Sequence, residues 1–530
     1  MSGTHIDVLI VGAGPVGLVT ACELLQRGAR VRLVDAERRF TRHSRANVLW
    51  PRIMELLDRT DVTRRLIGHG HPVSGVGYYS RGRRIGEVPM GGTTRYPFAL
   101  VISQNTVEEA LRARFAELGG TVESGLRLTA LDRTSPDGSV LATLEDDAGT
   151  VRTLRSDWLV GADGAHSTTR QLLGVEFDGD VVDVSFAVAD APVSGAPDDD
   201  LTYYCYSPDG GLALGPFGEG VWRLAITVPH QEPGTPPPGR EVFQQAVDAR
   251  APGHPVVGEL RWSAVFRARC RIAATFRVGR CLLAGDAAHI TSPAGGQGMN
   301  TGIQDAVNLG WRLAGVVDGS LHEDVLDHYD HERRAAAHFV ARTTTAQTKW
   351  GMARTPKRIL LRDGLFHLAH RAGLLRRSIT PLVSQLGVRY DTPASSRSEA
   401  PGLRAGDRVP LPLTPVNGRR LIARDEPGVL LWPGRARPAN WERVKERLLK
   451  ELAGLAPVVE PDALVRRRLR AALGSSPLAV VVRPDGHLAA AVPPEDPDAV
   501  VRALHRLGVR PDRPDRPDRP QEPTPTGGAR

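Results

Sequence analysis

The chain has 530 residues, of which 41% are hydrophobic and 24% charged, the composition of an ordinary soluble globular protein with two to four domains. Its net charge of +8 comes mainly from arginines scattered along the chain, without the basic stripe and interleaved aromatics of a nucleic-acid-binding protein. No signal peptide and no apolar run of membrane-spanning length is present, so we expect a cytoplasmic protein with no membrane partner. The four cysteines lack metal-site spacing, and no metal is expected.

The N-terminal segment predicts a dinucleotide-binding unit. Residues 5–11 form an apolar strand, the pattern Gly-x-Gly-x-x-Gly follows at 12–17, and a helix ends near Gly28. A second strand ends at Asp35. This arrangement predicts a tight turn, a pyrophosphate at the helix N-terminus and a carboxylate on the adenosine ribose, but it does not separate FAD from NAD. The expected cofactor contacts are Gly12, Gly14, Pro15, Val16, Gly17, Asp35 and Ala36.

The next part of the chain leads from a loop into a separate sheet. The loop carries Arg45 and runs into a helix that begins near Pro51. Residues 74–101 alternate and carry glycines, which predicts a hairpin outside the first sheet. Gln104 stands just before an amphipathic helix, where it could cap the helix or contact a ligand. Strands near 121–132 and 140–155 complete a meander.

A second motif and a change of periodicity follow. Residues 157–174 place Asp163 and Gly164 at a strand end, with Ser167 and Arg170 just beyond. From about 176 to 271, short strands separated by Gly, Pro and Asp predict a mostly antiparallel sheet. Aromatic side chains on these strands suit the wall of an aromatic ligand, although each taken alone is also an ordinary core residue. The candidates for substrate binding are Tyr204, Tyr206, Trp222 and Trp262.

Residues 281–313 form a third strand, glycine-rich loop and helix. The strand leads into Gly285 and Asp286, and the helix begins near Asn300. Glycines let backbone N–H groups approach a flat or anionic group, and the acidic residue can accept hydrogen bonds from hydroxyls. A tight turn without a ligand explains this loop equally well when it is considered alone. The candidate contacts are Asp286, Pro293, Gly295, Gly296, Gly298, Met299 and Asn300.

The three motifs together resemble the single-component aromatic flavoprotein monooxygenases of the para-hydroxybenzoate hydroxylase fold, and more narrowly the aromatic polyketide hydroxylases. The resemblance implies an α/β fold. A Rossmann-like FAD-binding domain would comprise residues 1–75, 100–175 and 272–395, with a mostly antiparallel β-sheet substrate domain inserted at 76–99 and 176–271. Residues 400–510 resemble a thioredoxin-like domain without a CxxC motif, and the Pro-rich residues 511–530 are expected to be disordered.

The resemblance also implies an activity. FAD would be reduced by NADPH or NADH as a transient reductant, O2 would form a C4a-hydroperoxyflavin, and an aromatic polyketide or related phenolic polycycle would be hydroxylated. Arg45 alone would take part in catalysis. Arg45, Gln104 and Asp163 would contact the cofactor, and Asp286 would hold the ribityl chain. A Baeyer–Villiger oxygenase, an epoxidase and a non-catalytic flavin-binding protein stay open as alternatives, and so does a homodimer.

Overall fold

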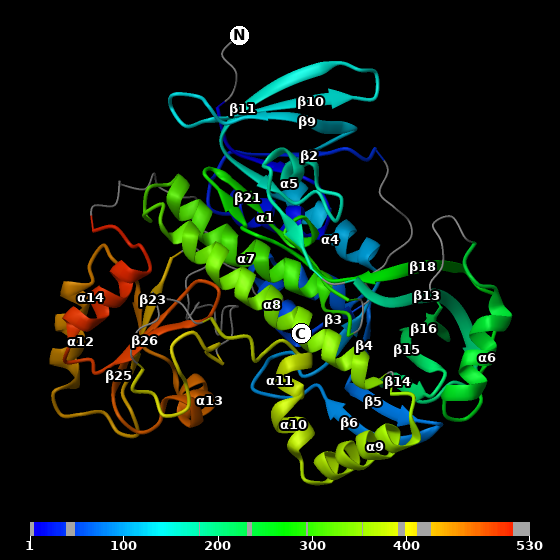
Figure 1. Ribbon diagram of the computed structural model, residues 1–530. Helices are drawn as coiled ribbons and strands as arrows, with labels where there is room; N and C mark the ends of the chain where they lie inside the picture. Colours follow the sequence, from blue (N-terminus) through cyan, green and yellow to red (C-terminus); the bar gives the residue numbers. More distant parts are fainter. Residues whose placement is uncertain are drawn as a thin grey trace, which may run out of the picture.

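The computed structural model describes residues 5–38, 48–179, 181–229, 236–292, 295–351, 353–390, 398–410 and 426–511. Figure 1 shows a mixed α/β molecule with one large sheet at the top, a second large sheet at the lower right and a smaller C-terminal module at the left. Arg45 and Pro293 lie outside the described residues, as does all but the first residue of the Pro-rich tail. Within the described part of the chain, no helix has the length and apolarity needed to cross a bilayer.

The first sheet has a parallel centre because its strands are joined through helices. Strand β1 pairs in parallel with β2 and β11, and β11 pairs in parallel with β21. All six residues of β1 are buried, as expected for a strand covered on both faces. The strands are β1 (Ile6–Val11), β2 (Val31–Asp35), β8 (Val122–Ser124), β9 (Leu126–Asp132), β10 (Val140–Asp146), β11 (Val151–Gly161), β20 (Arg277–Val278) and β21 (Cys281–Leu283).

Helices pack on this sheet and bring the glycine loops together. The first helix, α1, lies against both α4 and α7. The fingerprint loop leads into α1 and the third loop leads into α7, so the two loops end at neighbouring helices. Short strands and helices join the two large sheets. The helices of this part are α1 (Pro15–Leu25), α2 (Pro51–Leu57), α3 (Thr63–Ile67), α4 (Gln104–Glu117), α5 (Thr168–Leu172), α7 (Gly298–Val317), α8 (Val325–Gly351), α9 (Pro356–Arg371), α10 (Leu374–Ser378) and α11 (Thr380–Val383).

The second sheet is mostly antiparallel, with one parallel pair between β14 and β5. The hairpin expected at 74–101 is confirmed for β5 and β6, but β7 (Ala99–Val101) instead pairs with β3 (Val48–Leu49) and β4 (His71–Val73) in a small sheet. Helix α6 (Arg240–Arg250) packs on one face. The strands are β5 (Gly75–Ser80), β6 (Arg83–Pro89), β13 (Val181–Ser194), β14 (Leu201–Ser207), β15 (Gly210–Gly218), β16 (Val221–Val228), β17 (Val256–Val257) and β18 (Trp262–Arg269).

The C-terminal module is a four-stranded sheet in the order β24-β23-β25-β26, with one parallel pair and two antiparallel pairs. Helix α13 was not predicted from the sequence; its arginine-rich stretch hides a buried stripe of Val465, Leu469 and Leu473 at helical spacing. The elements are β23 (Gly428–Trp432), α12 (Trp441–Glu451), β24 (Val458–Val459), α13 (Ala463–Leu473), β25 (Leu478–Val482), β26 (Leu488–Val492) and α14 (Pro497–Arg506).

Candidate active site

The fingerprint glycines divide into two that pack and one that opens a space. A Cβ at Gly12 would lie 2.3 Å from the carbonyl oxygen of Ala162, and one at Gly17 would lie 1.9 Å from that of Gly12. Gly12 also has a φ of 104°, which favours glycine. A Cβ at Gly14, the N-cap of α1, would meet no atom within 4 Å. Gly12 and Gly17 therefore close the turn, and Gly14 leaves room in front of a helix N-terminus for an anionic group.

Asp35 ends β2 beside this turn. Its Oδ2 accepts a hydrogen bond from the backbone N of Ala13 at 2.5 Å, and its Oδ1 accepts one from the backbone N of Glu37 at 2.8 Å. Asp35 and Ala36 are both partly exposed. The carboxylate is thus held at the edge of the fingerprint loop, where an adenosine ribose would lie in a dinucleotide fold.

A cavity of about 660 Å³ joins the three motifs to the second sheet. We call it the central cavity. Gly14 and the start of α1 contribute the fingerprint side, the second motif follows the end of β11, and the loop before α7 lines the third side. The cofactor candidates that line the cavity are Gly14, Pro15, Val16, Gln104, Asp163, Asp286, Gly295, Gly296, Gly298 and Met299. Sequence motifs more than 250 residues apart therefore converge on one space.

The second sheet presents alternate residues to this cavity. Tyr204 and Tyr206 on β14 line it, while Tyr203 and Cys205, which alternate with them, are buried in the core on the α6 side. Burial raises the pKa of Tyr204 to about 12 and raises that of Tyr206 as well. Both hydroxyls stay protonated near neutral pH. They can donate hydrogen bonds but do not act as bases there.

The two tryptophan candidates are placed differently. Trp222 lies in the core on the α6 side, with its ring centroid 6.2 Å from that of Tyr203, so its expected contact with substrate is corrected. Trp262 is also outside the cavity lining among the described residues and lies 5.4 Å from the Arg223 guanidinium, measured to the ring centroid. Trp262 on β18 and Arg223 on β16 both pair with Asp190 and share one face. Trp222, next to Arg223 in sequence, points to the opposite face.

Arg223 is a site residue that motif reasoning missed. It lines the cavity and is 5% exposed, and its Nε and Nη2 donate to Asp190 Oδ1 and Oδ2 at 2.7 and 2.8 Å. This bidentate pair compensates the buried charge and fixes the guanidinium on the cavity wall. The period of two along β16 could have assigned its face once Leu224 and Ile226 were taken as core. Trp50, Phe186 and Gln347 also line the cavity and were not predicted.

Asp163 organises the second motif from the cavity wall. Its Oδ1 accepts from the Ser167 hydroxyl at 2.6 Å, and its Oδ2 accepts from the backbone N and the hydroxyl of Thr169, both at 2.9 Å. Arg170 donates to the carbonyl oxygen of Ala287 at 2.9 Å and so ties this motif to the third loop. The carboxylate has a structural task whatever it binds in addition.

The third loop holds Asp286 at the cavity while its neighbours are buried. Asp286 is exposed, whereas Gly285 and Ala287 beside it are buried. Asn300 uses its side chain internally: its Oδ1 accepts from the backbone N of Trp50 at 2.9 Å, and its Nδ2 donates to the carbonyl oxygen of Val48 at 2.8 Å. Asn300 therefore fixes the start of α7 against β3, and it is absent from the cavity lining of the described chain.

Gln104 was expected just before α4 but is its first residue. The N-cap is Ser103, whose hydroxyl accepts from the backbone N of Thr106 at 3.2 Å. Gln104 Nε2 donates to Glu108 at 2.8 Å, and the residue lines the cavity. The capping role weighed from the sequence thus belongs to its neighbour.

Comparison with known proteins assigns the family. Residues 5–344 match a family model described as an FAD binding domain. The chain belongs to this FAD-binding family. It is 34% identical to 6-methylpretetramide 4-monooxygenase of Streptomyces rimosus over 91% of this chain and 90% of that protein. This chain is an FAD-dependent monooxygenase.

Solved structures of similar proteins match this chain over nearly its full length. The OxyS anhydrotetracycline hydroxylase from Streptomyces rimosus is 31% identical, with a TM-score of 0.76 over 96% of this chain and all of that one. A ternary complex of aklavinone-11 hydroxylase with FAD and aklavinone is 26% identical, with a TM-score of 0.72 over 96% of this chain and all of that one. Both similarities extend over the C-terminal module as well as the cofactor motifs.

FAD fits the residues of this monooxygenase. The open space at Gly14 would be filled by a Cβ, and it faces the N-terminus of α1, whose aligned N–H groups favour phosphate. Gly164, with a φ of 78°, likewise has no atom within 4 Å of its would-be Cβ and lines the cavity. Asp286 on the cavity wall and Asp35 beside the fingerprint turn supply acceptors for hydroxyl groups.

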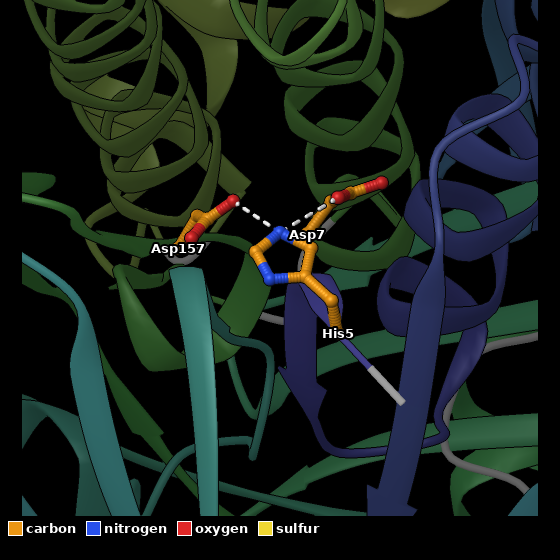
Figure 2. Close-up of side chains that lie close together, drawn as sticks. All are labelled: His5, Asp7 and Asp157. Atoms are coloured by element: carbon orange, nitrogen blue, oxygen red, sulfur yellow. Dashed lines mark hydrogen bonds and ion pairs between the residues drawn. The ribbon is translucent and has the colours of Figure 1, made fainter. Parts of the chain in front are cut away.

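One cluster of a histidine and two aspartates in the monooxygenase has potential metal ligands within 4.8 Å of one another. His5, Asp7 and Asp157 lie close together at the start of β1, the end remote from the glycine loop (Figure 2). His5 Nε2 is 2.9 Å from Asp157 Oδ2 and 3.3 Å from Asp7 Oδ1. Arg30 already neutralises Asp7 through a 2.5 Å ion pair, so we assign this group to the surface and not to the active site.

Proposed function

We propose that this monooxygenase hydroxylates an aromatic polyketide or a related phenolic polycycle held between the second sheet and the third glycine loop. The central cavity carries the proposal, because it joins the cofactor loops to a broad sheet face. That face combines small residues such as Gly211 and Ala213 with the two tyrosines. Its volume of about 660 Å³ lies within the range of ligand-binding cavities. The names of similar proteins support the same substrate class, because they refer to 6-methylpretetramide, anhydrotetracycline and aklavinone.

The chain's own residues would hold FAD and the substrate in order. Gly14 and the α1 N-terminus would bind the pyrophosphate, Asp35 the adenosine ribose, and Asp286 the ribityl hydroxyls. Backbone N–H groups of the loop from Gly295 to Met299 would face the flavin ring edge. FAD, when bound and reduced, supplies the oxygen activation that no amino-acid side chain provides. Tyr204 and Tyr206 would orient the substrate through protonated hydroxyls.

The reductant would bind beside this cavity. A second cavity of about 460 Å³ is lined by Arg170, Arg267, Arg269 and Arg271 together with His166. It shares Ala165, His166 and Ile290 with the central cavity. Four guanidinium groups suit the phosphates of NADPH or NADH, so we propose transient binding of the dinucleotide here. Arg45 would assist reduction and oxygen transfer, and it lies outside the described residues.

The domain organisation follows the same proposal. The FAD-binding domain would comprise residues 1–75, 100–175 and 272–395, and the substrate domain residues 76–99 and 176–271. The C-terminal order of strand, helix, strand, helix, two strands and helix supports a thioredoxin-like domain at 400–510. All four cysteines are buried and unpaired, which suits a reducing cytoplasm. A homodimer stays a prediction.

The test is turnover with defined substrates. The purified protein should show a flavin absorption spectrum and oxidise NADPH faster when a tetracyclic phenolic substrate is present. The product should gain one oxygen atom. Hydroxylation, Baeyer–Villiger oxidation and epoxidation all give that mass, so NMR and alkaline hydrolysis must identify a new phenol, an ester or an epoxide. A flavin-loaded protein that never consumes NADPH with any such substrate would support the non-catalytic alternative.

A further inference from the structure

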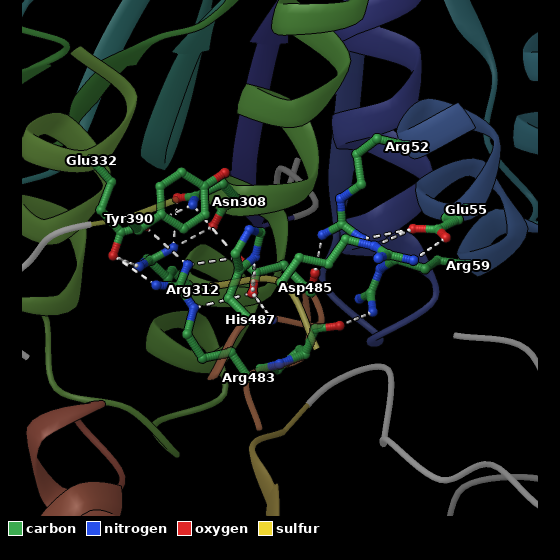
Figure 3. Close-up of polar contacts among 12 residues, drawn as sticks. Arg52, Glu55, Arg59, Asn308, Arg312, Glu332, Tyr390, Arg483, Asp485 and His487 are labelled. Carbon is green, nitrogen blue, oxygen red and sulfur yellow. Dashed lines mark hydrogen bonds and ion pairs between the residues drawn. The ribbon is translucent and has the colours of Figure 1, made fainter. Parts of the chain in front are cut away.

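The C-terminal module docks on the FAD-binding part through buried charges. Arg483 and Asp485 lie in the turn between β25 and β26, and Figure 3 shows this turn pointing toward α7 and α8. Arg483 donates to both oxygens of Glu332 at 2.8 and 2.9 Å, and Arg312 donates to Glu332 at 2.8 Å. These side chains are all at least 96% buried. Buried charges tolerate little displacement, so the docking position is well determined.

Tyr390 at this interface connects the C-terminal module to Arg333 in the FAD-binding part. The ring of Tyr390 lies 4.3 Å from that of His487, centroid to centroid, and the Arg483 guanidinium lies 4.9 Å from the Tyr390 centroid. Burial lowers the pKa of His487 to about 4, so its ring is neutral near pH 7. The Tyr390 hydroxyl accepts a hydrogen bond from Arg333 Nη1 at 2.9 Å. The module therefore holds the tyrosine that in turn holds Arg333.

From Arg333 the contacts reach the loop that carries Asp286. Arg333 Nε donates to Asp305 Oδ1 at 2.6 Å. The other oxygen of Asp305 accepts from the backbone N of Gly285 at 3.0 Å and lies 2.6 Å from His289 Nε2. Gly285 has a φ of 63°, and a Cβ there would lie 2.7 Å from Val16. The position of the Gly285–Asp286 loop thus depends on the position of the Asp305 carboxylate.

We propose that the C-terminal module positions the Gly285–Asp286 loop for the flavin through Tyr390, Arg333 and Asp305. Asp305 is fully buried, and the paired Arg333 and His289 keep the pKa of its carboxyl low in spite of a burial cost that acts to raise it. Removing part of this support shifts an anionic side chain that holds the loop backbone. These three are positioning residues. The inference rests on the proposed role of Asp286.

The test uses Tyr390→Phe in the full chain, which deletes the hydroxyl but keeps the ring on His487. The matched control is Tyr203→Phe in the second sheet, a tyrosine that is buried to the same extent and whose hydroxyl donates to the Asp198 carbonyl oxygen at 2.7 Å. We expect the Kd for FAD to rise about 3- to 10-fold in Tyr390→Phe, with a shifted spectrum and midpoint potential of the bound flavin. Tyr203→Phe should lower the Tm about as much as Tyr390→Phe does. It should leave the Kd for FAD, the flavin spectrum and the midpoint potential unchanged.

Two further variants separate the parts of the proposal. His487→Gln should weaken FAD binding in the same direction as Tyr390→Phe; if it changes only the Tm, the module has no part in positioning the loop. An unchanged flavin Kd and potential in Tyr390→Phe would overturn the inference. Asp286→Ala distinguishes the proposed role of Asp286 in FAD binding from the proposed positioning of its loop. If this variant also leaves FAD binding intact, the proposed role of Asp286 fails. If it weakens FAD while Tyr390→Phe does not, only the positioning fails.

Discussion

Substitution of Gly14 by alanine separates cofactor binding from folding. Gly14 has a φ of −73° and a ψ of −178°, which alanine adopts readily, and its Cβ would meet no protein atom within 4 Å. Replacing a helix N-cap glycine by alanine costs about 0.5–1 kcal/mol of stability, so Gly14→Ala should fold. The added methyl would occupy the space where we place the pyrophosphate.

The loss of flavin affinity follows from the contacts displaced. A hydrogen bond to a charged group contributes about 1.5–3 kcal/mol, so losing one raises the Kd for FAD about 10- to 150-fold. Deflavinated wild type and Gly14→Ala should be titrated with FAD by fluorescence, and their Tm values measured without flavin. Gly14→Ala should bind poorly with an apo Tm close to that of wild type.

Gly17→Ala is the contrasting control. Its Cβ would lie 1.9 Å from the backbone oxygen of Gly12, and this oxygen cannot move without opening the turn. This variant should lose stability even without flavin. A wild-type Kd for FAD in Gly14→Ala would refute the placement of the pyrophosphate at the α1 N-terminus.

Three other predictions can be checked with the same protein. Asp286→Ala should stay folded and lose most of its flavin at micromolar concentration, because an acceptor worth about 1.5–3 kcal/mol is removed; full occupancy would contradict it. Arg45→Ala should bind FAD but be reduced slowly or release hydrogen peroxide in stopped-flow assays, and wild-type rates and coupling would exclude Arg45 from the mechanism. Burial holds the pKa of His487 at about 4, against 6.5 in the unfolded chain. The unfolded chain therefore binds the extra proton between these values, and the free energy of unfolding should fall by up to about 3 kcal/mol as pH drops from 6.5 to 4. His487→Gln should flatten this dependence in denaturant titrations, and an equal slope in both proteins would contradict the assignment.

The sequence by itself determined the family and the order of the cofactor motifs. Strand, glycine turn and helix are local features, and the spacing from Gly12 to Asp35 specifies the dinucleotide fold before any distant contact forms. The same holds for the hairpin of β5 and β6, whose alternation is visible in the chain. Local periodicity also predicted a strand-rich region between the second and third motifs.

Only the tertiary structure decided which side chains meet at the cavity. Trp222 and Arg223 are neighbours in sequence, yet the packing of α6 sends the tryptophan to the core and the arginine to the cavity. A period of two gives two faces and does not say which of them a helix will cover.

The contacts among the buried charged residues were even harder to predict from the sequence. Asp305 and Tyr390 lie 85 residues apart, and Arg333 joins them only because α7, α8 and the C-terminal module pack around one point. In the sequence these residues have the appearance of ordinary helical and surface positions. A charge can be buried only where its partners are brought within hydrogen-bonding distance, and that proximity is a property of the folded chain.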